Sequence, residues 1–481
     1  MKRRSGKILW VYLSLLLMLC GCKMVWRSIR YNVPNVTDYK IWEERKVRRA
    51  GQVHGFVDGR QQGIAELDDW GFEPWYKEGM NFEDYMKRTG TVAFLVLKGD
   101  TLLKEYYDDK FADTSRFNVF SMTKAYVSTL TGIALHEGKI KSLDQSIGEY
   151  LPWCTDSGIC KISIRHLLQM TSGLKSNEAY LNPWGTSSKM YYGDQMQEIM
   201  HSLELKHPPG TRYFYQNVNT QLMGMILRRA VGMPLSNYLS EKIWQPLGME
   251  ADAGWSLAEG TDDEKAFCCL NARARDFARF GLLVLNQGNW HGKQLIPREW
   301  LAEVARPDTS QGAYNRYHFN WFLTPEEEDF WAEGLLGQFT YICPRSRMVI
   351  VRIGNSLDFK VPWYDSFKIL AGLRTKPRPI EFKKRDLRPF EGEFVYGLSN
   401  FGDTSLAGKH VTFVAKRRGL KVKTDYQKNW IAKPKSDSVF YQVAFGRVLT
   451  FHRDPDGQYR RITWNRRGNI WPVGKLEKSP K

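Results

Sequence analysis

The chain has 481 residues, of which 42% are hydrophobic, 14% aromatic and 25% charged. This composition excludes a disordered chain, a collagen-like chain and a polytopic membrane protein, and the length suggests two or three domains. The formal net charge is +18, and residues 371–481 alone hold 25 Lys and Arg against 10 Asp and Glu. The excess positive charge therefore belongs mainly to the C-terminal fifth, with a smaller share in the first 21 residues.

The N-terminus has the pattern of an export signal. A basic segment, residues 1–7, precedes an apolar segment, residues 8–19, which is shorter than the ~20 residues of a membrane-spanning helix. The following Leu19-Cys20-Gly21-Cys22 matches a lipoprotein signal, so we expect removal of residues 1–21 and acylation of Cys22. An uncleaved anchor helix and plain secretion are the alternatives. All three place the protein outside the cytoplasm, and as a lipoprotein it would lie in the bacterial cell envelope, facing the periplasm or the cell surface.

Residues 22–84 are polar and basic without a sustained period, and we interpret them as a tether and N-terminal extension. A regular pattern then runs from residue 85 to 372. Strands are expected at 91–97, 101–107, 339–342 and 348–353. Helices are expected at 122–137, 162–171, 217–231, 236–244 and 273–287. Strands at both ends with helices between them predict an α+β domain, with one antiparallel sheet flanked by helices and a helical subdomain.

The C-terminal part of the chain has a different pattern. Residues 373–388 read as a basic, proline-containing linker, and residues 389–481 contain short alternating runs separated by turns. This pattern predicts a small all-β domain of barrel or sandwich type. Its Lys and Arg either keep it soluble or bind an anionic envelope surface such as phospholipid headgroups or cell-wall polymer. Nucleic acid is not expected as a partner of an exported protein.

Two Ser-x-x-Lys motifs place a hydroxyl and an amine three residues apart. On a helix this spacing brings both groups to one face, as a nucleophile and its base require. Ser121-Met-Thr-Lys124 opens an apolar helical segment, whereas Ser172-Gly-Leu-Lys175 follows one and contains Gly, so it belongs at a helix end or turn. We therefore predict Ser121 as the nucleophile and Lys124 as part of its base. An N-cap role is the alternative for Ser121.

A second element, Tyr215-Gln-Asn217, precedes another apolar helical segment. A phenol can accept the serine proton if nearby cations lower its pKa, and an Asn can hydrogen-bond both Lys124 and a substrate amide. We predict Tyr215 and Asn217 as catalytic residues. Tyr213 lies two residues earlier and is easily mistaken for Tyr215. A packed aromatic loop is the alternative interpretation.

Together these motifs resemble the serine beta-lactamase family of class C type, with its penicillin-binding DD-peptidase, esterase and 6-aminohexanoate-dimer hydrolase relatives. Residues 142–152, 164–174, 247–249 and 272–281 also resemble segments of this family, in the same order. The resemblance covers about residues 85–372. It implies a beta-lactamase/transpeptidase-like fold, an acyl-enzyme on Ser121, Lys124 and Tyr215 as the general base, and no metal or organic cofactor.

The third catalytic motif of the family, Lys-Thr-Gly or His-x-Gly, is altered here to Gly334-Leu-Leu-Gly-Gln338. Leu335 replaces the cation and Leu336 the hydroxyl, while Gly337 is retained. By family analogy, the N–H groups of Ser121 and Gln338 form the oxyanion hole. The missing cation argues against an efficient beta-lactamase or carboxypeptidase. It favours a neutral ester or amide, or a substrate anchored elsewhere.

Several other residues have two interpretations. Arg275 or Arg279 could replace the missing cation, although a solvated helix face is the expectation for both. The aromatic residues of 179–184 and Tyr191-Tyr192 either shape an acyl pocket or belong to the core. Cys154 and Cys160 bracket a turn-like stretch and are either disulfide-bonded or free thiols, and Cys268-Cys269 match no metal-ligand pattern.

Three functions are consistent with these residues. The first is an envelope serine hydrolase acting on a small-molecule or peptide substrate. The second is a penicillin-binding sensor that is acylated but does not turn over, and the third is a scaffold with a vestigial pocket. The Leu335-Leu336 replacement is the feature that keeps the second and third open.

Overall fold

The computed structural model describes residues 27, 30–31, 33–64, 81–154, 158–179, 182, 184–356, 363–373, 384–396, 409–416, 419–424, 430–434, 439–442, 447–456, 458–466 and 469–475. The chain divides into two compact units, Met1–Gly63 with Thr91–Asn355, and Ile64–Gly90 with Ser356–Lys481. The predicted signal segment and Cys22 lie outside the described residues. Within the described residues, no helix is both long enough and apolar enough to cross a bilayer.

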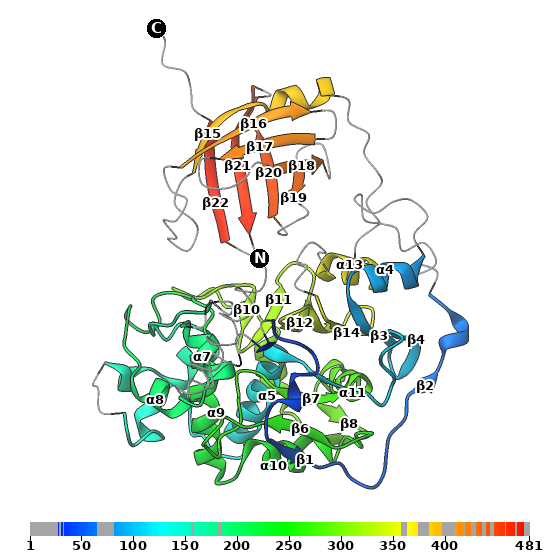
Figure 1. Cartoon of the computed structure of the whole chain (residues 1–481), viewed down its shortest axis with the longest axis vertical. Helices are drawn as coiled ribbons and strands as arrows, with labels where there is room; N and C mark the ends of the chain where they lie inside the picture. Colours follow the sequence, from blue (N-terminus) through cyan, green and yellow to red (C-terminus); the bar gives the residue numbers. More distant parts are fainter. Residues whose placement is uncertain are drawn as a thin grey trace, which may run out of the picture. The chain divides into compact units, whose positions relative to one another are not determined.

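The first unit is built on a sheet with the strand order β10-β11-β12-β13-β14-β3-β4-β2 (Figure 1). Neighbouring strands are antiparallel, except that β2 runs parallel to β4. The bounds are β2 (Val57–Asp58), β3 (Thr91–Lys98), β4 (Thr101–Tyr107), β10 (Tyr317–His318), β11 (Trp321–Thr324), β12 (Asp329–Gly334), β13 (Gln338–Cys343) and β14 (Met348–Gly354). This sheet, together with the helices around it, confirms the predicted α+β, beta-lactamase/transpeptidase-like fold class.

Helices surround this sheet and form a separate helical region. In the first unit they are α5 (Thr123–His136), α6 (Ile164–Leu168), α7 (Thr186–Tyr192), α8 (Met196–His201), α9 (Asn217–Val231), α10 (Leu235–Leu239), α11 (Ala274–Leu285) and α12 (Arg298–Val304). Helix α11 lies on strands β3, β13 and β14, and α9 packs against α5, α6 and α10. Because α5 is buried along nearly its whole length, its polar residues need partners inside the protein.

Short elements complete the first unit. They are η1 (Asp38–Lys40), η2 (Arg60–Gln62), η3 (Phe120–Met122), η4 (Ile147–Glu149), η5 (Ile159–Lys161), η6 (Ser240–Trp244), β8 (Asn289–Trp290) and β9 (Lys293–Gln294). The expected helix at 236–244 is divided into α10 and the π-helical η6, and the expected helix at 162–171 is reduced to α6. Helices α7 and α8 were not expected from the sequence, since both are short.

A second, smaller sheet has the order β1-β6-β7-β5. Its strands are β1 (Glu44–Val47), β5 (Arg116–Asn118), β6 (Ala253–Ser256) and β7 (Leu270–Arg273). Figure 1 shows β1, drawn in dark blue, beside β6 and β7. Part of the N-terminal extension is therefore a strand of this sheet, paired with a segment more than 200 residues later.

The second unit contains α4 (Phe82–Arg88), α13 (Trp363–Leu370), η7 (Lys384–Phe390) and a closed β-barrel. The barrel strands are β15 (Gly392–Tyr396), β16 (His410–Lys416), β17 (Gly419–Thr424), β18 (Trp430–Pro434), β19 (Val439–Gln442), β20 (Arg447–Arg453), β21 (Tyr459–Arg466) and β22 (Asn469–Lys475). Closure comes from pairing of β22 with β15. The predicted all-β domain is confirmed, and it is a barrel rather than a sandwich.

The barrel interior is aromatic. Phe390 of η7 contacts Phe440, Phe451 and Tyr459, with ring centroids 4.8, 4.9 and 4.5 Å away. These rings belong to one buried cluster with Val411, Leu420 and other strand residues that point inward. Among the strand residues whose side chains are described, Lys416, Lys423, Arg453 and Arg461 are exposed, as the alternating pattern of the sequence requires.

Disulfides join Cys154 to Cys160, with Cα atoms 5.9 Å apart, and Cys268 to its neighbour Cys269. The structure thus selects the bonded alternative for Cys154 and Cys160. Cys343 is a buried free thiol.

The contact between α11 and the sheet depends on Gly281. A Cβ atom at this position would lie 2.6 Å from Val349 Cγ1 and 3.1 Å from Thr340 Cγ2. We expect Gly281→Val to destabilise the protein by about 1–3 kcal/mol, as overpacking a core does. Thermal unfolding followed by circular dichroism measures this, with Gly51→Val as control because no atom lies within 4 Å of that Cβ position. Equal melting temperatures for both variants would contradict the proposed close contact.

Candidate active site

Ser121 lies in a tight turn between strand β5 and helix α5. The residue before it, Phe120, has φ 47°, a left-handed conformation that costs a non-glycine residue roughly 1 kcal/mol. The N–H of Phe120 donates to Asn118 Oδ1 over 3.0 Å, which holds this conformation. The turn leaves Ser121 half-buried at the start of α5, where the helix dipole favours a negative oxygen.

The amine of Lys124 lies one helical turn beyond Ser121 and is almost fully buried, with 1% of the residue exposed. Its Nζ is 2.9 Å from Ser121 Oγ, 2.8 Å from Asn217 Oδ1 and 2.8 Å from the carbonyl oxygen of Phe267. Three segments far apart in the sequence thus meet at one nitrogen. Two of them, at Ser121 and Asn217, were predicted, and the Phe267 carbonyl was not.

These three contacts determine the directions of the two N–H groups and the lone pair of a neutral Lys124 amine. Neutral lysine has two N–H groups and one lone pair. Asn217 Oδ1 and the Phe267 carbonyl can only accept hydrogen bonds, so they take both N–H groups. The lone pair is then left to face the hydroxyl of Ser121, which is the arrangement a general base needs.

Burial favours this neutral form. It lowers the pKa of the Lys124 amine to about 7, and the negative charge of Glu178 opposes part of the shift. A substantial fraction of the molecules therefore carries an unprotonated amine at neutral pH.

Hydrogen bonds on the side away from Lys124 fix the orientation of the Asn217 amide. Its Nδ2 donates to Glu178 Oε2 over 2.9 Å and to Ser187 Oγ over 2.8 Å. Its main-chain N–H also donates to Glu178 Oε2 over 3.2 Å. Because Nδ2 faces these acceptors, Oδ1 must face Lys124. Glu178 and Ser187 were missed from the sequence, where the only signal was an acidic residue directly before the aromatic stretch 179–184.

The ring of Tyr215 lies beside the same amine, with its centroid 5.0 Å from Lys124 Nζ. It is packed between Tyr317 and Phe322, at centroid distances of 5.7 and 6.3 Å. Tyr213 packs against Tyr317 as well, and burial raises its pKa well above the usual value. The structure therefore places the ring of Tyr215 beside Lys124, and the role of its hydroxyl in catalysis stays a prediction.

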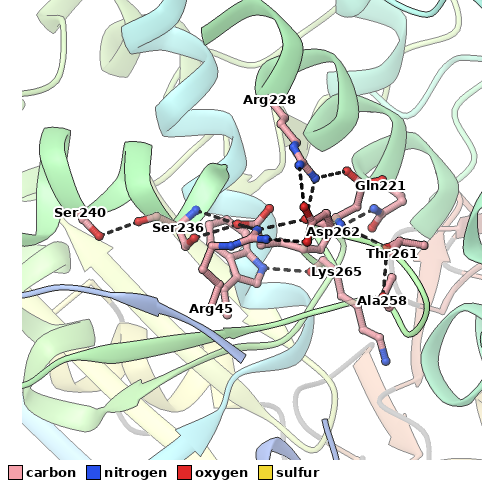
Figure 2. Close-up of polar contacts among 12 residues, drawn as sticks. Arg45, Gln221, Arg228, Ser236, Ser240, Ala258, Thr261, Asp262 and Lys265 are labelled. Carbon is pink, nitrogen blue, oxygen red and sulfur yellow. Dashed lines mark hydrogen bonds and ion pairs between the residues drawn. The ribbon is translucent and has the colours of Figure 1, made fainter. Parts of the chain in front are cut away.

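The loop that supplies the Phe267 carbonyl is held by an ionic network, part of which Figure 2 shows. Arg45 Nη1 donates to Glu264 Oε1 over 2.8 Å, and Ser236 Oγ donates to the same oxygen over 2.8 Å. Arg228 pairs with Asp263 over 2.8 Å. Gln221 of α9 contacts the main chain on both sides of Lys265, within the same loop.

The Cys268–Cys269 disulfide directly follows the Phe267 carbonyl. Trp255 Nε1 donates to the carbonyl oxygen of Cys268 over 3.3 Å, and Asn271 Nδ2 donates to that of Cys269 over 2.9 Å. The carbonyl groups around the disulfide are thus fixed by side chains of the small sheet.

The altered third motif lies against the nucleophile turn. A Cβ at Gly334 would lie 2.2 Å from the Val119 carbonyl oxygen, so the end of β12 approaches the turn closely. Leu336 and Gly337 have φ of 68° and 81° and form the turn into β13. The Gln338 side chain contacts both main-chain groups of Gly354, at 2.7 and 3.0 Å. The role of its main-chain N–H as an oxyanion donor stays a prediction.

A small apolar cavity opens beside Ser121. It is lined by Pro34, Phe120, Tyr191, Phe267, Cys268 and Leu335. Its volume is about 10 Å³, roughly the space of one water molecule. Tyr191 therefore lines the pocket, as one of the two interpretations proposed, whereas Trp184 is 67% exposed.

The second Ser-x-x-Lys motif is split between core and surface. Ser172 is fully buried and its hydroxyl bonds Asn219, while Lys175 forms an exposed ion pair with Glu204 at 2.7 Å. This agrees with the expectation that it is a decoy.

The expectation for Arg275 and Arg279 was wrong. Arg275 forms two 2.7 Å hydrogen bonds with Glu105, and Arg279 is completely buried beside Asp276 and Glu250. Carboxylates at the base of α11 thus occupy both guanidinium groups. Arg279 is a core ion-pair residue rather than part of a solvated face.

Among the described residues, no group of three or more His, Cys, Asp or Glu is arranged to hold a metal ion.

Comparisons with known proteins agree with this geometry. Residues 80–364 match the family model named Beta-lactamase. The 6-aminohexanoate-dimer hydrolase of Paenarthrobacter ureafaciens is 28% identical over 312 residues, 58% of this chain and 76% of the relative. An Escherichia coli K12 protein provisionally named D-alanyl-D-alanine carboxypeptidase is 30% identical over 302 residues, 50% of this chain and 68% of the relative.

A solved structure has the same fold. It is a Bacillus anthracis protein provisionally named 6-aminohexanoate-dimer hydrolase, with a TM-score of 0.63 and 23% identity. The match covers 72% of this chain and 94% of that chain.

The state of Lys124 predicts the pH dependence of catalysis. With the unprotonated amine as the predicted base, kcat/KM for a neutral ester should rise with pH through about 7. Glu178→Gln keeps an acceptor for Asn217 but removes the negative charge that favours the ammonium form. The pKa of Lys124 then falls further, and the rising limb moves to lower pH.

The matched control is Glu204→Gln, which removes an exposed carboxylate paired with Lys175. Its pH profile should coincide with that of the unchanged protein. A limb that stays in place in Glu178→Gln would contradict the electrostatic coupling between Glu178 and Lys124.

Proposed function

The chain belongs to the beta-lactamase family and is a serine hydrolase, and we propose that Ser121 is the nucleophile with which it cleaves an ester, amide or peptide bond. The observation that carries this proposal is the triple contact of the Lys124 amine. Its two obligate acceptors leave the lone pair for the Ser121 hydroxyl.

Acylation follows from this arrangement. Lys124 takes the proton as Ser121 Oγ bonds to the substrate carbonyl carbon, and the carbonyl electron pair moves onto its oxygen. The N–H groups of Ser121 and Gln338 hold this oxyanion. When this tetrahedral intermediate collapses, the bond to the leaving group breaks. The proton that Lys124 took from Ser121 then passes to the leaving group by way of the Tyr215 hydroxyl.

Deacylation repeats the chemistry with water. Lys124 and Tyr215 together accept a proton from a water molecule that attacks the acyl carbon. The bond to Ser121 Oγ then breaks, and the proton returns to the serine.

A neutral acyl group fits this site best. Leu335 lines the pocket where many relatives carry a cation, and the Arg275 and Arg279 side chains are bonded to carboxylates elsewhere. The relatives are named for the hydrolysis of 6-aminohexanoate dimer and for D-alanyl-D-alanine carboxypeptidase activity. We propose a neutral ester or amide rather than an anionic peptide end.

A second candidate function is a penicillin-binding sensor that is acylated but does not turn over. The replacement of the family's cation and hydroxyl by Leu335 and Leu336 is the feature that supports it, because the cation at this place helps to hold a substrate carboxylate.

We further propose that the protein works in the bacterial cell envelope, as a lipoprotein anchored to the membrane through Cys22. The disulfides support an oxidising compartment. The 25 Lys and Arg of residues 371–481 would hold the barrel near an anionic surface such as phospholipid headgroups.

The nucleophile can be tested by covalent labelling. Intact mass after exposure to a fluorophosphonate should rise by one adduct in the unchanged protein. Ser121→Ala should abolish the adduct, and Ser172→Ala should retain it, because that hydroxyl is bonded inside the core. A labelled Ser121→Ala protein would contradict the assignment.

Turnover is tested by a time course with an ester and with a labelled penicillin. We expect the ester acyl adduct to disappear with release of the acid. An adduct that persists with every substrate would support the sensor instead.

A further inference from the structure

We propose that the N-terminal segment 34–38 completes the acyl pocket, and that Pro34 restricts the enzyme to small, uncharged acyl groups, of which acetyl fits best. This inference rests on the proposed role of Ser121 as nucleophile. It assigns a specificity-determining residue to a part of the chain that precedes the family-matched region, residues 80–364.

The pocket itself defines the size of the group. Pro34 and Leu335 line it together with aromatic rings and Cys268, so apart from Ser121 its wall is nonpolar. With a volume of about 10 Å³, the space of about one water molecule, it has room for a single methyl group. A carboxylate or ammonium group in the acyl part would lose its hydration there without gaining a partner.

Segment 34–38 is fixed by its own turn. The N–H of Asn35 donates to Asp38 Oδ2 over 2.9 Å, and the N–H of Thr37 donates to Asn35 Oδ1 over 3.0 Å. Between them, Val36 is completely buried, and its carbonyl accepts a 2.7 Å bond from the N–H of Asn118. The backbone next to Pro34 is therefore attached to the strand that leads to the nucleophile.

A chain of hydrogen bonds joins the segment to the nucleophile turn. The Tyr191 hydroxyl donates to Asp38 Oδ2 over 2.8 Å and accepts from Asn118 Nδ2 over 3.1 Å. The other end of the Asn118 amide accepts the N–H of Phe120. Tyr191 and Phe120 are both pocket residues. The wall at Pro34 and the wall at Phe120 are thus held in one network and cannot move apart independently.

Trp42 supports this wall from behind. Its ring lies edge-on to Tyr191 at 5.9 Å, and the buried Lys265 amine lies 3.3 Å from its centroid. Lys265 also donates to the Tyr191 carbonyl oxygen over 2.7 Å. Further along, β1 pairs with β6 and Arg45 binds Glu264. These contacts make segment 34–38 a fixed wall, so it restricts size rather than adapting to larger groups.

The test is the acyl-length profile of the full chain, measured as kcat/KM for p-nitrophenyl acetate, propionate, butyrate and octanoate. We expect acetate to be preferred and kcat/KM to fall with each added carbon. Pro34→Ala removes two ring carbons from the wall and should raise the butyrate-to-acetate ratio about ten-fold, as one or two extra methylenes do in an apolar pocket. Leu335→Ala should raise the butyrate-to-acetate ratio as well, because Leu335 is another wall residue of the same pocket.

The matched control is Pro344→Ala, in the exposed turn between β13 and β14, which should leave the ratio unchanged. Fluorophosphonate labelling at Ser121 establishes that each variant is folded and active. A wild-type preference for octanoate, or ratios unchanged in both Pro34→Ala and Leu335→Ala, would overturn the inference. Absence of labelling and of hydrolysis in the unchanged protein would instead overturn the proposed function.

Discussion

The amine of Lys124 lies where there is almost no water, and an ammonium ion there loses hydration that its neighbours only partly replace. Its neutral form is satisfied by two acceptors and one hydroxyl. This requirement explains much of the surrounding structure. Asn217 needs Glu178 to orient it, and the Phe267 carbonyl needs an anchored loop behind it. The chemistry of one nitrogen thus extends to contacts well outside the pocket.

The site is assembled from segments that the sequence separates widely. Helices α5 and α9 bring Lys124 and Asn217, the loop before β7 brings Phe267, and the N-terminal extension brings Pro34. The ionic network of Arg45, Glu264 and Ser236 links the N-terminal extension, the loop before β7 and helix α10 through a single carboxylate. Precision at the nucleophile is therefore a property of the first unit as a whole rather than of one motif.

The fold class and the main candidate residues of the site could be predicted from the sequence. Both depend on residues that are close together in the chain, in a short motif or in a strong apolar pattern. Ser121-Met-Thr-Lys124 requires only one helical turn, and β3 and β14 are recognisable as uniformly apolar runs. Glu178 and the Phe267 carbonyl could not be found in this way. A half-buried carboxylate looks like any surface acid in a sequence, and a main-chain oxygen has no sequence signal at all. The burial of Arg279 was not predicted because two of its partners, His54 and Glu250, lie far from helix α11 in the sequence.

The N-terminal segment has a consequence for the order in which the protein is made. Residues 34–47 precede their partners, Tyr191 and strand β6, by some 150 to 210 residues, so they are synthesised well before them. Contacts of such long range form slowly, because closing long loops costs chain entropy. The pocket next to Ser121 can therefore close only after most of the first unit has left the ribosome, and the nascent chain carries an open, unfinished site until then.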